Sequence, residues 1–205
     1  WGVYWLPQRY LENGGLTGGW GTISQMMIGI LLLTPISLWR KFKGRSSGLE
    51  IPFVGFLTGS GFICYALSFL LTDVVRALIM FYMIPVWTTI FEIIFLKKRP
   101  GLERVLTLGL ALGGLWIVFS KSNIVPLPQN AGDWLALVGG VLFGGGLIRL
   151  EITKTDGVFP VIFSFFFYGT IFNIFAGYIL KDYLGPVPPA EAFLSMFTFL
   201  VLISV

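Results

Sequence analysis

Long apolar stretches alternate with short polar segments along the whole chain. Most stretches are long enough to cross the roughly 30 Å apolar core of a bilayer as helices. The pattern predicts an all-α, polytopic helical membrane protein, with the first stretch reading as the second half of a span and the last as the start of one. The predicted spans are Trp1–Tyr10, Thr22–Leu38, Ile51–Leu71, Val74–Leu96, Val105–Ser120, Trp134–Ile148, Val158–Leu180 and Pro189–Val205.

The segment Asp73–Ser120 is the most informative part of the pattern. It contains the apolar run Val74–Leu96, a basic turn and the apolar run Val105–Ser120. Pro85 lies near the middle of the first run, where a membrane span tolerates a proline if neighbouring helices or water satisfy the freed carbonyl. The second run carries glycines at 109, 113 and 114. This spacing predicts close packing against another helix.

Charge predicts the orientation of the spans. Charged residues make up only 12% of the chain, against about 25% in a soluble domain. More than half of the 14 basic residues lie in two loops, Arg40–Arg45 and Lys97–Arg104, which the positive-inside rule places in the cytoplasm. The first span then runs outward and the sixth runs inward. Because each half would hold five spans, an odd number, the second half would have the opposite topology. We therefore expect an inverted repeat of five-helix units, over residues 1–122 and 132–205.

The residues that follow Arg76 resemble a known family pattern, with a proline in the middle of the fourth span, a turn with Glu and Arg, and a glycine-rich fifth span. The matching residues are Ala77-Leu78, Ile84-Pro85-Val86-Trp87-Thr88-Thr89-Ile90, Phe95-Leu96, Arg99, Leu102-Glu103-Arg104, Gly109 and Leu112–Val118, together with Trp1-Gly2. The chain is identified by this resemblance as an EamA-type member of the drug/metabolite transporter superfamily. The family often ends its fourth span with an acidic residue, where this chain has Lys97-Lys98.

The resemblance implies ten spans in two five-helix repeats, of which this chain holds about eight. We therefore expect the sequence to be an internal piece of a longer protein. The implied function is transport of small organic solutes or metabolites, with amino acids and drugs as candidates, by alternating access. An alternative is a structural or assembly subunit that does not transport. The expected location is a bacterial-type plasma (inner) membrane.

Two charged residues in the fourth span are candidates for the solute pathway. Arg76 either contacts a solute or extends its charge to the outer interface, and its closeness to Asp73 favours the second interpretation. Glu92 lies about one turn from the cytoplasmic end of the span. It either lines the route, where it could carry a proton, or pairs with Lys97 or Lys98, and the sequence does not separate these alternatives.

The other candidates are mostly aromatic. Aromatic rings can line a cavity and stack on flat solutes, although each one alone is more simply explained by helix packing. Tyr82 and Pro85 are three residues apart and would share a helix face, so they are the first choice. Pro85 is either a hinge or a static kink. The remaining candidates are Trp5, Tyr65, Trp87 and Arg9, the last of which could also form an interfacial pair with Glu12.

Residues for catalysis are scarce. The chain has no histidine, one cysteine (Cys64) and no nucleotide-binding or hydrolase motif, so we expect neither an enzyme nor a metal or other cofactor. A membrane-embedded enzyme would need a clustered nucleophile, base or metal set. The net charge of +4 is explained by the two basic loops and does not require a nucleic-acid partner. The expected partners are the lipid bilayer, a small-molecule solute and, as an open alternative, a second copy in a homodimer.

Overall fold

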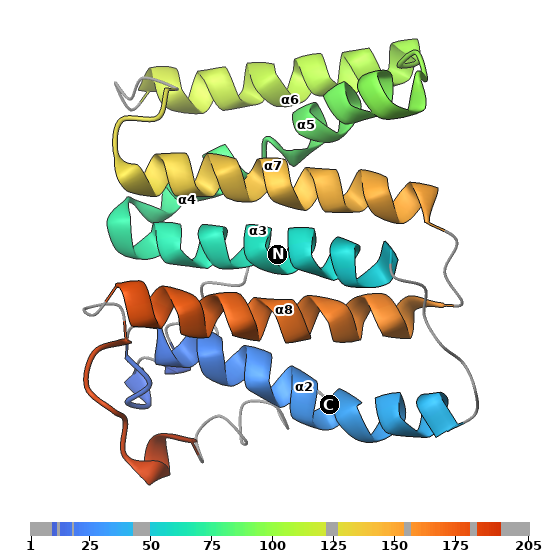
Figure 1. The fold of residues 1–205 in the computed structure, drawn as a ribbon. Helices are drawn as coiled ribbons and strands as arrows, with labels where there is room; N and C mark the ends of the chain where they lie inside the picture. The colour runs from blue at the N-terminus through green and yellow to red at the C-terminus, as the bar shows by residue number, and fades with distance from the viewer. Residues whose placement is uncertain are drawn as a thin grey trace. The chain divides into compact units, whose positions relative to one another are not determined.

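The computed structural model describes residues 10–11, 13–17, 19–42, 50–121, 127–153, 157–180 and 184–193, and consists of helices joined by turns and short irregular segments in these ranges (Figure 1). No strand occurs in these ranges. The helices are α2 (Trp20–Phe42), α3 (Glu50–Leu71), α4 (Val74–Phe81), α5 (Ile84–Phe91), the π-helix η1 (Glu92–Leu96), α6 (Leu102–Lys121), α7 (Ala131–Ile152) and α8 (Val158–Ile179).

Within the part of the chain that the structure describes, five segments are long and apolar enough to cross a membrane. They are Trp20–Trp39, Glu50–Leu71, Val74–Leu96, Ala131–Ile152 and Val158–Ile179. Each corresponds to a predicted span, and α6 forms over the predicted fifth span. The all-helical, membrane-spanning class is therefore confirmed. The inverted repeat, its boundaries and the number of spans stay predictions. Trp5 and Arg9 lie outside the described residues, as do most of the predicted first and eighth spans.

The helices divide into two compact units, Trp1–Gly59 with Thr155–Val205, and Ser60–Lys154. In the first unit, glycines let helices approach closely. A Cβ atom built on Gly29 of α2 would lie 2.4 Å from the Phe166 ring of α8. A Cβ atom on Gly59 would lie 2.7 Å from the backbone nitrogen of Gly169. Small residues are typical of helix contacts in membranes, where apolar side chains gain little by leaving lipid.

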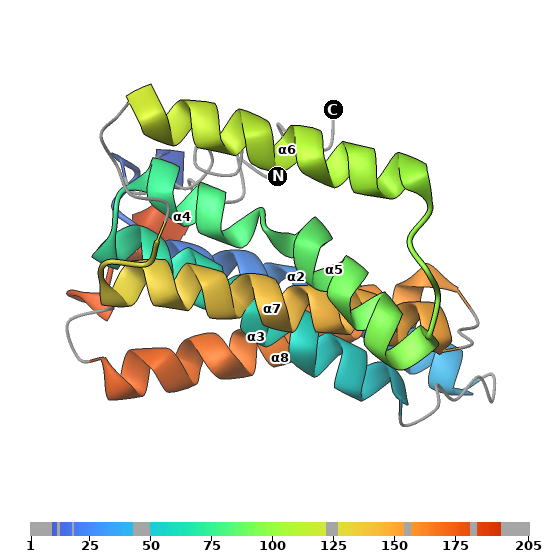
Figure 2. The ribbon, with the colours of Figure 1, turned by 90° about the horizontal axis from the view of Figure 1, so that it is seen from above.

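In the second unit, α7 packs against three partners. A Cβ atom on Gly139 would lie 2.6 Å from the carbonyl oxygen of Gly61, in the second half of α3. A Cβ atom on Gly140 would lie 2.9 Å from the carbonyl oxygen of Phe81 in α4. A Cβ atom on Gly144 would lie 3.3 Å from Cβ of Trp87 in α5. Figures 1 and 2 both show α7 running beside the α4–α5 segment.

The fourth span is not one continuous helix. The chain turns at Tyr82 and Met83, and the irregular connection between α4 and α5 is visible in Figure 2. Pro85, in the first turn of α5, supplies the physical reason: it has no N–H to donate to the Phe81 carbonyl, and its ring clashes with that oxygen in a regular helix. The shared-face geometry expected for Tyr82 and Pro85 assumed a continuous helix and therefore does not apply.

The glycine-rich face of α6 is not packed against the residues that the structure describes. A Cβ atom on Gly109, Gly113 or Gly114 would meet nothing within 4 Å. The predicted close helix contact of this face is therefore not made with any described residue. At the N-terminal end of α6, Arg104 bonds to α5 and η1.

Candidate functional site

Six of the eight predicted pathway residues lie in the second unit. Arg76, Tyr82, Pro85, Trp87 and Glu92 are spread along the fourth span, and Tyr65 lies on the neighbouring part of α3. The span has three distinct environments: a buried ionic network at the start of α4, an aromatic region at the break, and a polar cluster along α5 and η1.

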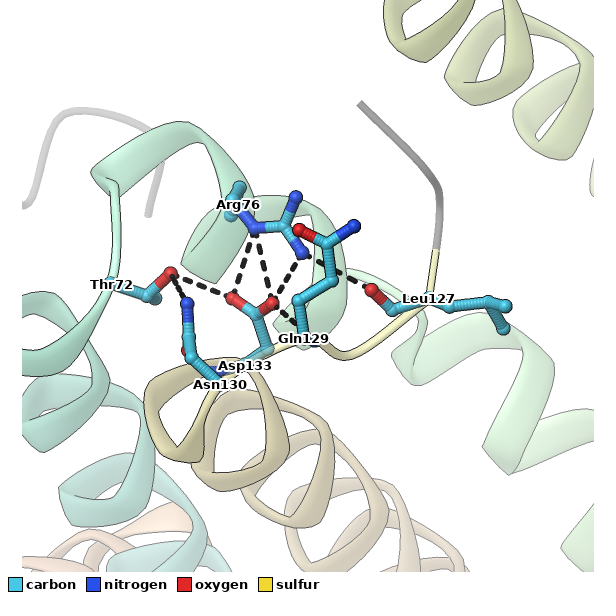
Figure 3. A network of polar contacts seen from close by, with 6 residues as sticks. All are labelled: Thr72, Arg76, Leu127, Gln129, Asn130 and Asp133. Carbon is cyan, nitrogen blue, oxygen red and sulfur yellow. Dashed lines mark hydrogen bonds and ion pairs between the residues drawn. The ribbon is translucent and has the colours of Figure 1, made fainter. Parts of the chain in front are cut away.

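The network at the start of α4 is centred on a buried ion pair between Arg76 and Asp133 (Figure 3). The Arg76 Nε donates to both carboxylate oxygens of Asp133, at 3.2 and 3.1 Å, and its Nη2 also contacts Oδ2. Nη2 donates in addition to the carbonyl of Leu127 at 3.1 Å. Arg76 is 5% exposed and Asp133 is fully buried. The charge of Arg76 is therefore satisfied by Asp133 and the Leu127 carbonyl, and its extension to the membrane interface stays a prediction.

The Asp133 carboxylate receives further hydrogen bonds from its surroundings. The hydroxyl of Thr72 donates to it at 2.7 Å, and the backbone N–H of Gln129 donates at 2.9 Å. Asn130 caps α7 by accepting from the Asp133 backbone N–H at 2.8 Å and donates through Nδ2 to the Thr72 hydroxyl at 3.0 Å. These bonds offset the cost of burying two charges, so loss of either charged partner would be strongly destabilising. The first turn of a helix also favours an acidic residue.

The middle of the span is aromatic. Tyr65 is buried and stacks on Phe81 with ring centroids 4.0 Å apart, and Phe81 in turn contacts the Phe143 ring at 5.8 Å. Tyr82 and Pro85, at the break, are exposed. The indole Nε1 of Trp87 is buried and has no hydrogen-bond partner among the described residues. Tyr65 therefore lies in a packed core, whereas Tyr82 and Pro85 face away from it.

A polar cluster lies beyond the break. Glu92 Oε2 pairs with Arg104 Nη1 at 2.6 Å, so the predicted pairing of Glu92 with Lys97 or Lys98 is wrong. The Arg104 Nε donates to the Thr89 hydroxyl at 2.9 Å. The hydroxyls of Thr88 and Thr89 donate to the carbonyl of Pro85, at 3.0 and 2.7 Å. Backbone, hydroxyl, guanidinium and carboxylate thus form one connected chain of bonds.

Lys98 instead pairs with Glu151 at the end of α7, with Nζ 2.6 Å from Oε1. The hydrogen bond that the Lys98 ammonium donates to the Glu151 carboxylate raises the pKa of Lys98. The start of α4 contacts the start of α7 through Arg76 and Asp133. The turn after η1 contacts the end of α7 through Lys98 and Glu151. The fourth span and α7 therefore run in the same direction, with α6 between them in the chain.

Sequence reasoning missed Asp133, Arg104 and Glu151, although each partners a residue that it had selected or placed in the basic turn. The sequence did contain a signal for Asp133. Asn130, three residues earlier, is a strong helix cap, so a helix that begins there has Asp133 in its first turn. The arrangement supplies fixed charges, hydroxyls and aromatic faces. It holds no cluster of metal-ligating side chains within the residues described.

Five long apolar helices, one of them broken between two charged clusters, define a polytopic integral membrane protein. The comparison with protein families gives the more specific result. The model of the EamA-like transporter family matches residues 1–120, more than half of the chain, and the chain belongs to this family of membrane transporters. Neither the curated proteins nor the solved structures contain a match.

Proposed function

We propose that this protein is a secondary transporter that moves small organic solutes or metabolites by alternating access. Family membership is the observation that carries this proposal. The broken fourth span supports it, because transporter sites often lie at interrupted helices near the bilayer midplane. Amino acids and drugs are the candidate solute classes. A solute or proton gradient would drive transport, since the sequence contains no nucleotide-binding motif.

The proposed route follows the fourth span past the break. Tyr82 and Pro85 are exposed there, and the polar cluster of Thr88, Thr89 and Glu92 continues in the same direction along the chain. Glu92 would carry the proton if transport is proton-coupled. Arg76 has a different role, because Asp133 and the Leu127 carbonyl occupy its guanidinium. It positions the start of the span and does not contact the solute.

The membrane arrangement is part of the same proposal. The basic turn at Lys98 would face the cytoplasm, and the Thr72 turn the outside of a bacterial-type plasma membrane. Residues 1–122 and 132–205 would belong to two inverted repeats, embedded in the lipid bilayer, with a homodimer as one assembly. The protein would act as a carrier and not as an enzyme, and would not bind nucleic acid.

Transport by the full chain in proteoliposomes tests the function. Solid-supported membrane currents would be recorded with a panel of L-amino acids and with ethidium, with and without a pH gradient. We expect a saturable current for at least one compound, reduced by Tyr82→Ala and made pH-independent by Glu92→Gln. Glu103→Gln is the matched control, since this exposed acid begins α6 beside Arg104. Absence of current with every compound, in folded protein, would favour the structural subunit.

Sidedness is tested separately. In a Cys64→Ala background, Lys98→Cys should react with a membrane-impermeant maleimide only after cells are permeabilised. Labelling in intact cells would contradict the proposed orientation.

A further inference from the structure

We propose that the break at Tyr82–Met83 joins an anchored half of the fourth span, α4, to a releasable half, α5–η1, and that Lys98–Glu151 and Glu92–Arg104 form the latch of the releasable half. A role in solute transport rests on the proposed function, but the mechanical asymmetry itself does not. Of the two interpretations of Pro85, hinge or static kink, the proposal takes the hinge and gives it one moving side.

The first observation is the difference in burial between the ionic contacts at the two ends. Arg76 and Asp133 are buried and share their network with Thr72, Gln129 and Leu127. Separating such a pair leaves an uncompensated charge in the interior, which is strongly unfavourable. The side chains of Lys98 and Glu151 are 59% and 44% exposed, and those of Arg104 and Glu92 are 39% and 14% exposed. Water replaces the exposed Lys98–Glu151 pair at little cost, and the Arg104–Glu92 pair is half-buried with its cation exposed, so this end separates more easily than the buried one.

The second observation is the fit of the span against α7. At the end of α4 the backbones are at their limit, because a Cβ atom on Gly140 would lie 2.9 Å from the Phe81 carbonyl. The fit loosens along α5. A Cβ atom on Gly144 would lie 3.3 Å from Cβ of Trp87, which is still tight, and one on Gly145 would lie 3.7 Å from the Phe91 ring, which is an ordinary contact. The interlocked half is the anchored one, and the looser half is the releasable one.

The third observation is the backbone of the releasable half. It ends in a π-helix over Glu92–Leu96, where the backbone N–H of Lys97 bonds to the Glu92 carbonyl. Lys97 itself adopts a left-handed conformation with φ of 52°, which costs free energy for a residue with a side chain. Single turns of π-helix often occur at functional sites. The strained end of the span is therefore the one that the exposed pairs hold.

Release of the latch would move α5–η1 away from α7 and α6 while α4 stays in place. This movement would uncover Trp87, whose indole N–H is buried without a partner among the described residues, and would free the Glu92 carboxylate from Arg104. A solute arriving from the Lys98 end would then meet both groups. The same movement at the Thr72 end would require breaking the buried network.

Hydrogen–deuterium exchange of the full chain in lipid nanodiscs tests the asymmetry without any transport assay. We expect amides of residues 88–98 to exchange faster than those of residues 75–81. Lys98→Gln should speed exchange of residues 88–98 by up to about fivefold, the most that loss of one exposed pair usually allows, and Lys98→Gln with Arg104→Gln should speed it further. Residues 75–81 should not change. Arg99→Gln, an exposed cation in the same turn, is the control and should have no effect.

Exchange of wild-type protein in 1 M NaCl provides an arm free of substitutions, since salt screens exposed pairs far more than buried ones. High salt should speed amide exchange of residues 88–98 only. The charge-swapped double variant, Lys98→Glu with Glu151→Lys, should exchange as slowly as wild type in these residues. Equal acceleration of residues 75–81 would overturn the proposal. So would an unchanged exchange rate of residues 88–98 in the variant Lys98→Gln with Arg104→Gln. Asymmetric exchange in a protein that transports none of the tested compounds would keep the hinge and remove only the proposed function.

Discussion

The contact between Gly61 and Gly139 gives the sharpest test of the packing. In Gly139→Ala the new methyl group would lie 2.6 Å from the Gly61 carbonyl oxygen and 3.1 Å from the backbone nitrogen of Tyr65. A comfortable carbon-to-oxygen contact is about 3.3–3.6 Å, so α3 and α7 must separate by roughly 0.7 Å. Both obstacles are backbone atoms, so no side chain can rotate to make room.

The expected loss follows from two opposing terms. Overpacking of a tight contact costs about 1–3 kcal/mol, and replacing glycine by alanine inside a helix returns about 1 kcal/mol. Their difference is about 0–2 kcal/mol, so we expect Gly139→Ala to lower the free energy of unfolding by about 1 kcal/mol, or the melting temperature by roughly 2–4 °C for a chain of this size. The 7 tryptophans allow the melt to be followed by intrinsic fluorescence in detergent.

The matched control is Gly113→Ala on α6, where the added methyl group meets nothing within 4 Å. It should leave the melting temperature unchanged or raise it. Gly61→Ala strains the same contact from the other side, at 2.7 Å from the Gly139 carbonyl, so the double variant should lose less than the sum of the single losses. A Gly139→Ala protein as stable as wild type, or an equal loss in Gly113→Ala, would refute this reasoning.

Three further predictions concern the polar contacts of the second unit. Asp133→Asn should destabilise by about 3–5 kcal/mol in a chemical unfolding titration, because it leaves the Arg76 charge buried and unpaired; replacing both residues by leucine should cost clearly less. Asn130→Ala should cost about 1 kcal/mol by loss of the α7 cap, and Asn130→Ser should recover most of it, both measured as shifts in the unfolding midpoint. The Lys98–Glu151 pair should be pH-dependent only in the alkaline range. Because the pKa of Lys98 is raised above its usual value of 10.5, the stability it contributes is present below that value and is lost as pH rises through the higher folded-state pKa. The difference in melting temperature between wild type and Lys98→Gln should therefore stay constant from neutral pH to about pH 9.5 and shrink above pH 10.5.

The positions of the helices were largely predictable from the sequence. Ile51–Leu71 was predicted as a span and forms as Glu50–Leu71, and Val158–Leu180 forms as Val158–Ile179. The reason is physical: the bilayer sets a minimum length for every apolar run, and polar or glycine residues at each end limit it. A run of apolar residues therefore carries its own boundaries.

The partners of the charged residues were not predictable in the same way. The closeness of Asp73 in sequence favoured the interface for Arg76, yet its partner Asp133 is contributed by α7, with α5, η1, α6 and a connector between them. For Glu92 the adjacent lysines were one of two open alternatives, whereas Arg104 reaches it from the next helix. Closeness in sequence identifies neighbours on one helix. It does not identify which helices pack together, because that depends on tertiary contacts such as those of the α7 glycines.

The position of Asp133 also has a consequence for biosynthesis. The ribosome makes Arg76 well before Asp133, so a nascent chain that has just inserted its fourth span holds a cation with no counterion. Such a group is costly in hydrocarbon. We expect the guanidinium to stay in contact with water until α7 is synthesised, and arrival of the aspartate then allows it to be buried as it is in the folded protein. The ion pair thus makes the folding of α4 complete only after α7 has been inserted.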